Sequence, residues 1–236
     1  LLQRPNIEQR RNALWALTRI VGKTPDPRAQ AAIRLALAND AASIRLTACR
    51  SLATYPDPAA LPALLTIVKQ DEPAVRREAA KAIGRIGDAS ALPALVANLH
   101  RDVDRSEEHA LIYALIEIND AATTARLLGL KHFTTTGAQS TLASEAARRG
   151  MIAMHQIDPA QLSAEVMLPL LDTDHKALRL AALEIVRQHP DWSRQALPSL
   201  AKWLESETSL QSRHDVARGL LTGFLADPSF QALVGK

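Results

Sequence analysis

Apolar residues recur at helical spacing along the chain, in stripes separated by short polar breaks. Within residues 72–102 the first stripe advances in steps of three and four and comprises Val75, Ala79, Ala82, Ile83 and Ile86. Such steps place side chains on one face of a helix about 20 Å long. A second stripe follows, with Leu92, Leu95, Val96 and Leu99. The pattern therefore predicts two helices in this segment.

The break between the two stripes carries residues that end one helix and start the next. Gly87 is suited to end the first helix, because glycine readily adopts the left-handed conformation of a C-terminal cap. Asp88 or Ser90 is suited to start the second by accepting a hydrogen bond from a free backbone N–H. Other breaks carry Asp-Pro or Asn-Asp followed by alanine. Two helices per unit are therefore expected along the chain.

The two-helix unit repeats with a spacing of 31 to 41 residues. Superposing the units aligns seven positions, namely Arg10, Arg45, Arg76, Glu107, Arg148, Arg179 and Arg213. Neither apolar stripe can be covered within one helical pair, so the pairs must stack on their neighbours. We therefore expect a stack of about six to seven helical pairs, with a polar insertion at residues 131–140 in the longest interval.

The segment from Asp71 to Leu95 resembles the HEAT-repeat family, in the short-unit form first noted in phycobilin lyases. The resemblance extends over nearly the whole chain and implies an all-α fold, a right-handed α-α superhelical solenoid. It implies one HEAT-repeat solenoid domain over residues 1–236. Because the sequence begins and stops within a repeat, we expect this domain to be part of a longer protein.

The composition agrees with a helical chain and offers little chemistry. Hydrophobic residues make up 47% of the chain but aromatic residues only 3%, so the apolar content is mostly helix-forming Ala, Leu, Ile and Val. No apolar run approaches the roughly 20 residues of a membrane span. The single cysteine, Cys49, excludes an internal disulfide framework, and its small apolar neighbours predict inert packing.

No catalytic, metal-binding or cofactor-binding motif is recognisable. The seven histidines lack the i, i+4 spacing that places two metal ligands on one helix face. A Gly-x-Ser-x-Gly nucleophile elbow and a phosphate-binding glycine loop are also missing. We therefore predict that the chain is not an enzyme and binds neither a metal nor a cofactor.

An acidic residue precedes the aligned arginine by five positions in several units. The pairs are Asp40 with Arg45, Asp71 with Arg76, and Asp174 with Arg179, whereas Asp102 precedes Glu107, where the pair fails. The HEAT resemblance implies a ladder in which each Asp bonds backbone or arginine groups of its own and the next repeat. Such ionised, hydrogen-bonded acids favour a structural role over general-base catalysis.

Charge is unevenly distributed along the sequence. The net charge, counted as Lys and Arg residues against Asp and Glu residues, is +7 for residues 1–101 (15 against 8), −6 for 102–174 (5 against 11) and +2 for 175–236 (8 against 6). In HEAT arrays the helix with the aligned arginine generally lines the concave side, which predicts a partner-binding ridge of Arg11, Trp15, Arg19, Arg50, Arg77, Lys81 and Arg85. In the fourth unit the row continues with Glu108, Ile112 and Glu117.

The ridge favours an acidic partner surface, with Trp15 as an anchor of the kind enriched at binding hot spots. The alternative is a merely solvated face, with Trp15 packed inward. Trp192 and Trp203 are predicted to pack in the core or at a repeat junction. Reversing the charge at Arg77 and Lys81 is expected to weaken partner capture without lowering the melting temperature.

The leading hypothesis is a non-catalytic scaffold that binds another protein or a neighbouring domain of the same chain. The segment 15–20 also resembles HEAT modules of large exported bacterial proteins, between a sugar-dehydrogenase-like β-propeller and a c-type cytochrome domain. That resemblance implies an exported or periplasmic location and a role in positioning redox domains. Without it, a cytoplasmic location is expected.

Two other functions remain open. The basic ridge is similar to that of the HEAT-like alkylpurine DNA glycosylases, which implies nucleic-acid binding on a concave face. A net charge of only +3, with an acidic centre, argues against a continuous phosphate track. The repeat subtype alone suggests a role like that of bilin lyases or their chaperones.

Overall fold

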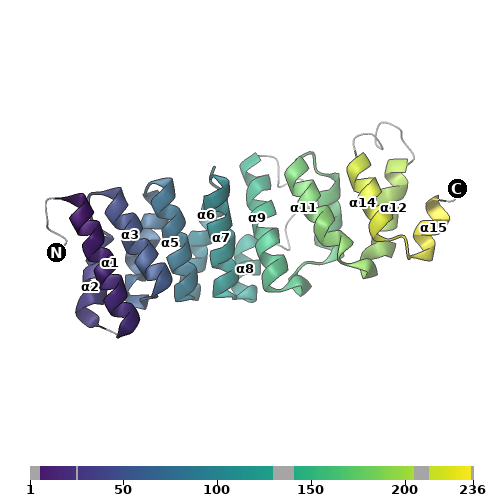
Figure 1. Cartoon of the computed structure of the whole chain (residues 1–236). Helices are drawn as coiled ribbons and strands as arrows, with labels where there is room; N and C mark the ends of the chain where they lie inside the picture. The colour runs from purple at the N-terminus through teal and green to yellow at the C-terminus, as the bar shows by residue number, and fades with distance from the viewer. Residues whose placement is uncertain (1–5, 25, 130–140, 205–212, 235–236) are drawn as a thin grey trace. The chain divides into compact units, whose positions relative to one another are not determined.

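The computed structural model describes residues 6–24, 26–129, 141–204 and 213–234, and in these ranges every regular element is a helix (Figure 1). The all-α prediction is therefore confirmed. The insertion expected at residues 131–140 lies outside the described residues. By its internal contacts the chain forms two compact units, residues 1–127 and 128–236. One solenoid domain over the whole chain stays a prediction.

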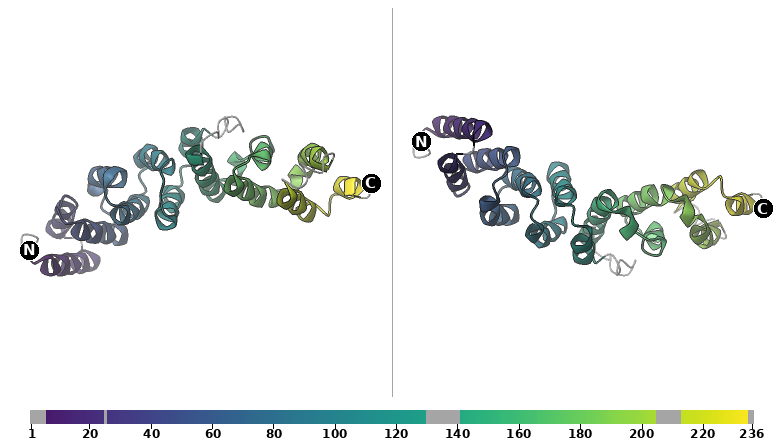
Figure 2. Two further views of the ribbon diagram at one scale, coloured as in Figure 1. Left: turned by 90° about the horizontal axis from the view of Figure 1, so that it is seen from above. Right: turned by 90° about the horizontal axis from the view of Figure 1, so that it is seen from below.

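Unit 1 consists of helical pairs arranged in two layers. Its helices are α1 (Ile7–Lys23), α2 (Pro27–Ala36), α3 (Ala42–Thr54), η1 (Pro58–Ala60), α4 (Leu61–Gln70), α5 (Pro73–Ile86), η2 (Ala89–Ala91), α6 (Leu92–Leu99) and α7 (Arg105–Ile118), and α8 (Ala121–Leu128) ends at the boundary between the units. Helices α1, α3, α5 and α7 pack side by side and form the first layer, while α2, α4 and α6 form the second (Figures 1 and 2).

The helices of unit 1 begin and end where local chemistry directs them. Asp26, Asp57, Asp88 and Asp104 each accept a hydrogen bond from a backbone N–H of the turn that follows, which satisfies donors that a helix leaves free. Gly87 ends α5 in the left-handed conformation, with φ 73°. The stop at Gly87 and the cap at Asp88 are therefore confirmed.

The core of unit 1 is formed by the predicted stripes. Val75, Ala79, Ala82 and Ile83 on α5 and all four apolar residues of the α6 stripe are buried, whereas Ile86 is half-buried. Helices α5 and α7 approach so closely that a Cβ on Gly84 would lie 2.8 Å from the Cα of Ala114. Small residues thus allow neighbouring repeats to stack.

Unit 2 also consists of stacked helices. They are α9 (Thr141–Ile157), η4 (Pro159–Gln161), α10 (Ala164–Met167), η5 (Leu168–Asp172), α11 (Lys176–Arg187), η6 (Pro190–Trp192), α12 (Ser193–Leu204), α14 (His214–Gly223) and α15 (Pro228–Val234). Helix α11 packs between α9 and α14, and α12 packs on α14 and α15. Trp192 and Trp203 are buried, as predicted.

Cys49 lies on α3 in the interior of unit 1 and is fully buried. Burial, together with the nearby carboxylates of Asp71 and Glu78, raises the pKa of its thiol to about 12. Since the thiolate is the reactive form, we expect the folded protein to react with a maleimide or a disulfide reagent at least about 100-fold more slowly than the unfolded chain. Labelling rates with and without denaturant test this, and equal rates would contradict it.

Candidate interaction surface

The aligned arginines of unit 1 bind the acid of the following repeat. Arg45 donates from Nε and Nη2 to the two carboxylate oxygens of Asp71, both at 2.6 Å. Its Nη1 donates to the backbone carbonyls of Asn39 and Asp40, at 2.9 and 2.8 Å. One side chain therefore joins the loop before its own helix to the loop before the next one.

Arg76 repeats this arrangement with a different acid. It donates from Nε and Nη2 to the carboxylate of Glu107, both at 2.6 Å, and from Nη1 to the backbone carbonyl of Asp71 at 2.8 Å. Glu107, where the spacing of an Asp five residues before an Arg is not kept in the sequence, thus pairs with the arginine of the preceding repeat. Glu107 is 1% exposed and accepts both hydrogen bonds from this arginine. The aligned arginines of the earlier units instead donate hydrogen bonds to an acid of the next repeat.

These pairs fix the charge states of their members. Hydrogen bonding from Arg45 lowers the pKa of Asp71. Hydrogen bonding to Asp71 raises the pKa of Arg45, and hydrogen bonding to Glu107 raises that of Arg76. The Asp71 carboxylate therefore remains ionised and makes a poor proton acceptor, which favours a structural role in the stacking of repeats.

In unit 2 the ladder changes. Arg179 donates from Nη1 to the carbonyl of Thr173 at 2.7 Å, but among the described residues its buried Nε has no partner. Asp174 pairs instead with Arg213, 3.1 Å away. Burial, and then the nearby charge of Arg213, lowers the pKa of Arg179. The pairing of Asp174 with its own Arg179 is thus not observed.

The predicted ridge lies on three neighbouring helices of the first layer. Arg11, Trp15 and Arg19 are on α1, Arg50 is on α3, and Arg77, Lys81 and Arg85 are on α5. Helix α3 packs between α1 and α5, so the structure brings the seven residues onto one layer of unit 1. Trp15 is 41% exposed, which excludes the inward-packed alternative.

Glu78 underlies this ridge and was missed by the sequence reasoning. Its side chain is 6% exposed, and its carboxylate lies 3.3 Å from Arg77, 3.3 Å from Lys81 and 3.7 Å from Arg50. The three-residue step from Glu78 to Lys81 was a readable signal for one of these contacts. The contact with Arg50 comes from another helix, and no local pattern indicates it.

Two further acids neutralise part of the ridge. Glu8 binds Arg11 at 2.5 Å, and Glu117 binds Arg85 at 3.1 Å. In the described ranges, the ion pairs found for the ridge join its cations to three carboxylates, and the six cations and three carboxylates together carry a net charge of +3 (6 − 3). Among the described residues, Arg19 is the ridge cation for which no ion pair is found.

The described residues contain no group of three or more His, Cys, Asp or Glu side chains arranged to hold a metal ion. In the same ranges no helix combines the length and the hydropathy that a membrane span requires.

Comparison with known proteins agrees with the architecture. Residues 31–116 match the family model of HEAT repeats. An archaeal HEAT-like repeat protein from Thermococcus onnurineus NA1 is similar in structure, with a TM-score of 0.50 and 13% identity over 94% of this chain and 100% of that chain. The complex of CpcE and CpcF of phycocyanin lyase from Nostoc sp. PCC7120 gives a TM-score of 0.49 and 22% identity, over 93% of this chain and 92% of that chain. No curated protein matches the sequence.

The predicted α solenoid is confirmed by the helical architecture together with the archaeal neighbour. The family model covers the two units from which the repeat was first read, those around Arg45 and Arg76, and reaches into α7. Residues 31–116 therefore belong to the HEAT-repeat family, and the chain has the fold of a HEAT-type α solenoid.

Proposed function

We propose that the first layer of unit 1 binds an acidic segment of another protein or of a neighbouring domain, with an apolar residue of that segment packed on Trp15. One observation carries this proposal. Trp15 is 41% exposed, and Arg19, also exposed, follows it one helical turn later without an ion pair among the described residues. Tryptophan and arginine are among the residue types enriched at the hot spots that dominate binding energy at protein interfaces.

Three other cations of the ridge differ from Arg19 in being held by an ion pair. Arg50, Arg77 and Lys81 are held by the buried carboxylate of Glu78, so their side chains are already partly ordered before a partner arrives. Prior order lowers the conformational entropy that binding must remove. The net positive charge of the ridge favours the approach of acidic partners and excludes basic ones.

The same compensation argues against duplex nucleic acid as the partner. Glu78 and Glu117 place two carboxylates among the cations that would have to follow a phosphate backbone. Binding to DNA depends on the number of phosphates neutralised, so a ridge of this net charge gives only weak affinity. A HEAT-repeat scaffold that binds protein is therefore the function that the geometry supports best.

The test compares two matched double variants of the full chain. Trp15→Ala with Arg19→Glu removes the exposed anchor and reverses the charge of the neighbouring ridge cation. Leu35→Ala with Arg28→Glu makes the same kind of change on α2, where Leu35 is 75% exposed and Arg28 is exposed. Proteins captured by the unaltered chain from an extract of the source organism are identified, and the dissociation constant of the purified partner is measured with each variant.

The α1 variant is expected to weaken partner binding at least about tenfold, because truncating a hot-spot aromatic typically costs about 2 kcal/mol or more. The α2 variant should bind within about twofold of the unaltered chain. Equal affinity of all three chains would contradict the proposal. Saturable binding of a duplex at about 150 mM salt, lost in the α1 variant, would show that nucleic acid is the partner instead.

A further inference from the structure

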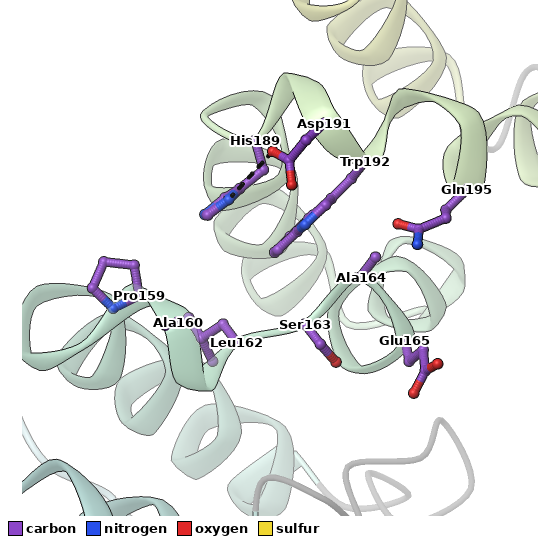
Figure 3. Close-up of a pocket in the computed structure, with 10 residues that line it drawn as sticks. All are labelled: Pro159, Ala160, Leu162, Ser163, Ala164, Glu165, His189, Asp191, Trp192 and Gln195. Carbon is purple, nitrogen blue, oxygen red and sulfur yellow. Dashed lines mark ion pairs between the residues drawn. The ribbon is translucent and has the colours of Figure 1, made fainter.

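The described tryptophan and phenylalanine side chains of unit 2 are buried, even beside an open groove of about 500 Å³. This groove lies between η4 with the start of α10 and η6 with the start of α12 (Figure 3). Trp192 at the groove is 8% exposed, and its ring stacks on His189 with centroids 4.0 Å apart. Among the described residues, the exposed tryptophan and tyrosine side chains belong to unit 1 and are Trp15, Tyr55 and Tyr113.

Tyr55, the residue that follows α3, lies directly on the backbone of α1. A Cβ added to Gly22 would overlap the Tyr55 hydroxyl and would lie 2.8 Å from Cε2 of the same ring. The glycine therefore makes room for the tyrosine, since a larger residue at this position would displace the ring. Tyr55 nevertheless remains 39% exposed, so its ring both packs against α1 and faces solvent.

This contact places Tyr55 close to two residues of the ridge. Gly22 follows Trp15 by seven positions and Arg19 by three, and residues at these spacings lie on one face of a helix. At a rise of about 1.5 Å per residue, Trp15 and the point where Tyr55 meets α1 are about 10 Å apart along the helix, with Arg19 between them. An exposed arginine is thus flanked by two exposed aromatic side chains from neighbouring repeats.

One turn after Arg19, helix α1 carries a second cation. Lys23 lies in the last turn of α1 and is exposed. No ion pair of Arg19 or of Lys23 is found among the described residues. A carboxylate of a partner can therefore bind here without displacing an acid that the structure places on either cation.

We propose that Tyr55 is a second anchor of the partner-binding surface and that the partner segment is an amphipathic acidic helix. The proposal rests on the proposed function, whose anchor Trp15 it shares. The site presents its groups at the levels of positions i, i+4 and i+7 of α1, and a helix presents one of its own faces with the same spacing. A helix lying along α1 places one apolar side chain on Trp15, an acidic side chain on Arg19 and a second apolar side chain on Tyr55.

The test is a ¹⁹F NMR titration of the full chain labelled with 3-fluorotyrosine and 5-fluorotryptophan. The chain contains two tyrosines and three tryptophans, so Tyr113→Phe and Trp15→Phe assign the signals that matter. The probe is a capped, alanine-rich helical peptide of about 20 residues with leucine, glutamate and leucine at positions i, i+4 and i+7. Saturable shifts are expected for Tyr55 and Trp15, and none for Tyr113.

A second peptide of identical composition tests the spacing. Its two leucines are two positions apart, which places them on opposite sides of the helix at about 100° per residue. Only one of them can then contact α1 at a time. This peptide is expected to bind at least about fivefold more weakly than the first, because it can occupy only one of the two aromatic anchors.

Two variants separate the anchor from the stability of unit 1. Tyr55→Ala removes the ring, whereas Gly22→Ala keeps the ring but displaces it from α1, and each is expected to weaken binding of the first peptide at least about fivefold. Alanine is a better helix former than glycine, so Gly22→Ala is expected to fold, and its melting temperature checks this. Tyr113→Ala is the matched control on α7, where the tyrosine is 48% exposed, and it should leave the affinity unchanged.

The outcomes distinguish this inference from the proposed function. A saturable shift of Trp15 without one of Tyr55, or equal affinity of Tyr55→Ala and the unaltered chain, would overturn the second anchor and leave the role of Trp15 intact. Equal binding of the two peptides, or no saturable shift at either anchor, would overturn the helical occupant. Weaker capture of a partner from the extract by Trp15→Ala with Arg19→Glu would still support the proposed function in that case.

Discussion

Replacing Glu107 by alanine should lower the free energy of unfolding of unit 1 by about 3–5 kcal/mol. The carboxylate is 1% exposed and receives two hydrogen bonds from Arg76, whose side chain is 10% exposed. The variant would leave a nearly buried guanidinium without its counter-ion at the junction between α5 and α7. Burying an unpaired charge is among the most destabilising changes available to a folded chain.

The unfolding of unit 1 can be followed in the full chain through Cys49. This thiol is buried in unit 1, so its labelling rate as a function of denaturant reports the opening of that unit alone. The matched control is Glu8→Ala, which removes a carboxylate at a comparable distance from its arginine but on the surface, with side-chain exposures of 57% and 43% for Glu8 and Arg11. We expect a loss of at most about 0.5 kcal/mol there.

A companion variant distinguishes charge burial from lost packing. Arg76→Met together with Glu107→Leu replaces both partners by apolar side chains, and it should restore most of the stability that Glu107→Ala removes. Equal labelling rates in Glu107→Ala and the unaltered chain would contradict the structural role of the pair.

Reversing the charge of Arg77 and Lys81 together should also destabilise unit 1, by about 2 kcal/mol. This prediction replaces the expectation from sequence that the same change leaves the melting temperature unaltered. The reason is Glu78, whose side chain is 6% exposed and lies 3.3 Å from both residues. After reversal, its carboxylate would face two new carboxylates and retain only Arg50, at 3.7 Å.

Thermal unfolding of the reversed variant, alone and combined with Glu78→Gln, measures this effect. The neutral amide removes the buried charge, so the reversal should cost less in the Glu78→Gln background than in the unaltered one. Arg19→Glu is the control for charge reversal on the same layer. It should leave the melting temperature nearly unchanged, because no ion pair of Arg19 is found among the described residues. An equal cost in both backgrounds would contradict the role assigned to Glu78.

This outcome bears on how the ridge is tested. A variant that both removes cations and destabilises unit 1 would weaken partner binding for two reasons at once. Trp15 and Arg19 lie on the exposed face of α1 and avoid the Glu78 cluster, so their replacement measures binding alone. The substitutions that test partner binding should therefore be made on α1 rather than on α5.

The aromatic residues illustrate how far burial was predictable. Trp192 and Trp203 were expected inside and are buried, while Trp15 was placed on the ridge and is exposed. Trp15 was placed by its equivalence to a solvent-facing position of the third unit, whereas Trp192 and Trp203 were assigned to the core or a repeat junction as large aromatic side chains. The groove beside Trp192 was not predicted, because its walls come from two short helices separated by about 30 residues of chain, and the packing of successive repeats brings them together.

The sequence by itself determined the helical pairs and where they begin and end. Apolar periodicity and caps act over a few residues, so the stripe of α5, its stop at Gly87 and the cap at Asp88 were all readable. Only the tertiary structure decided which charged groups meet. The pairing of Arg76 with Glu107 and of Arg50 with Glu78 joins helices of neighbouring repeats. Such contacts depend on the separation and rotation of packed helices, which a spacing along one chain segment does not specify.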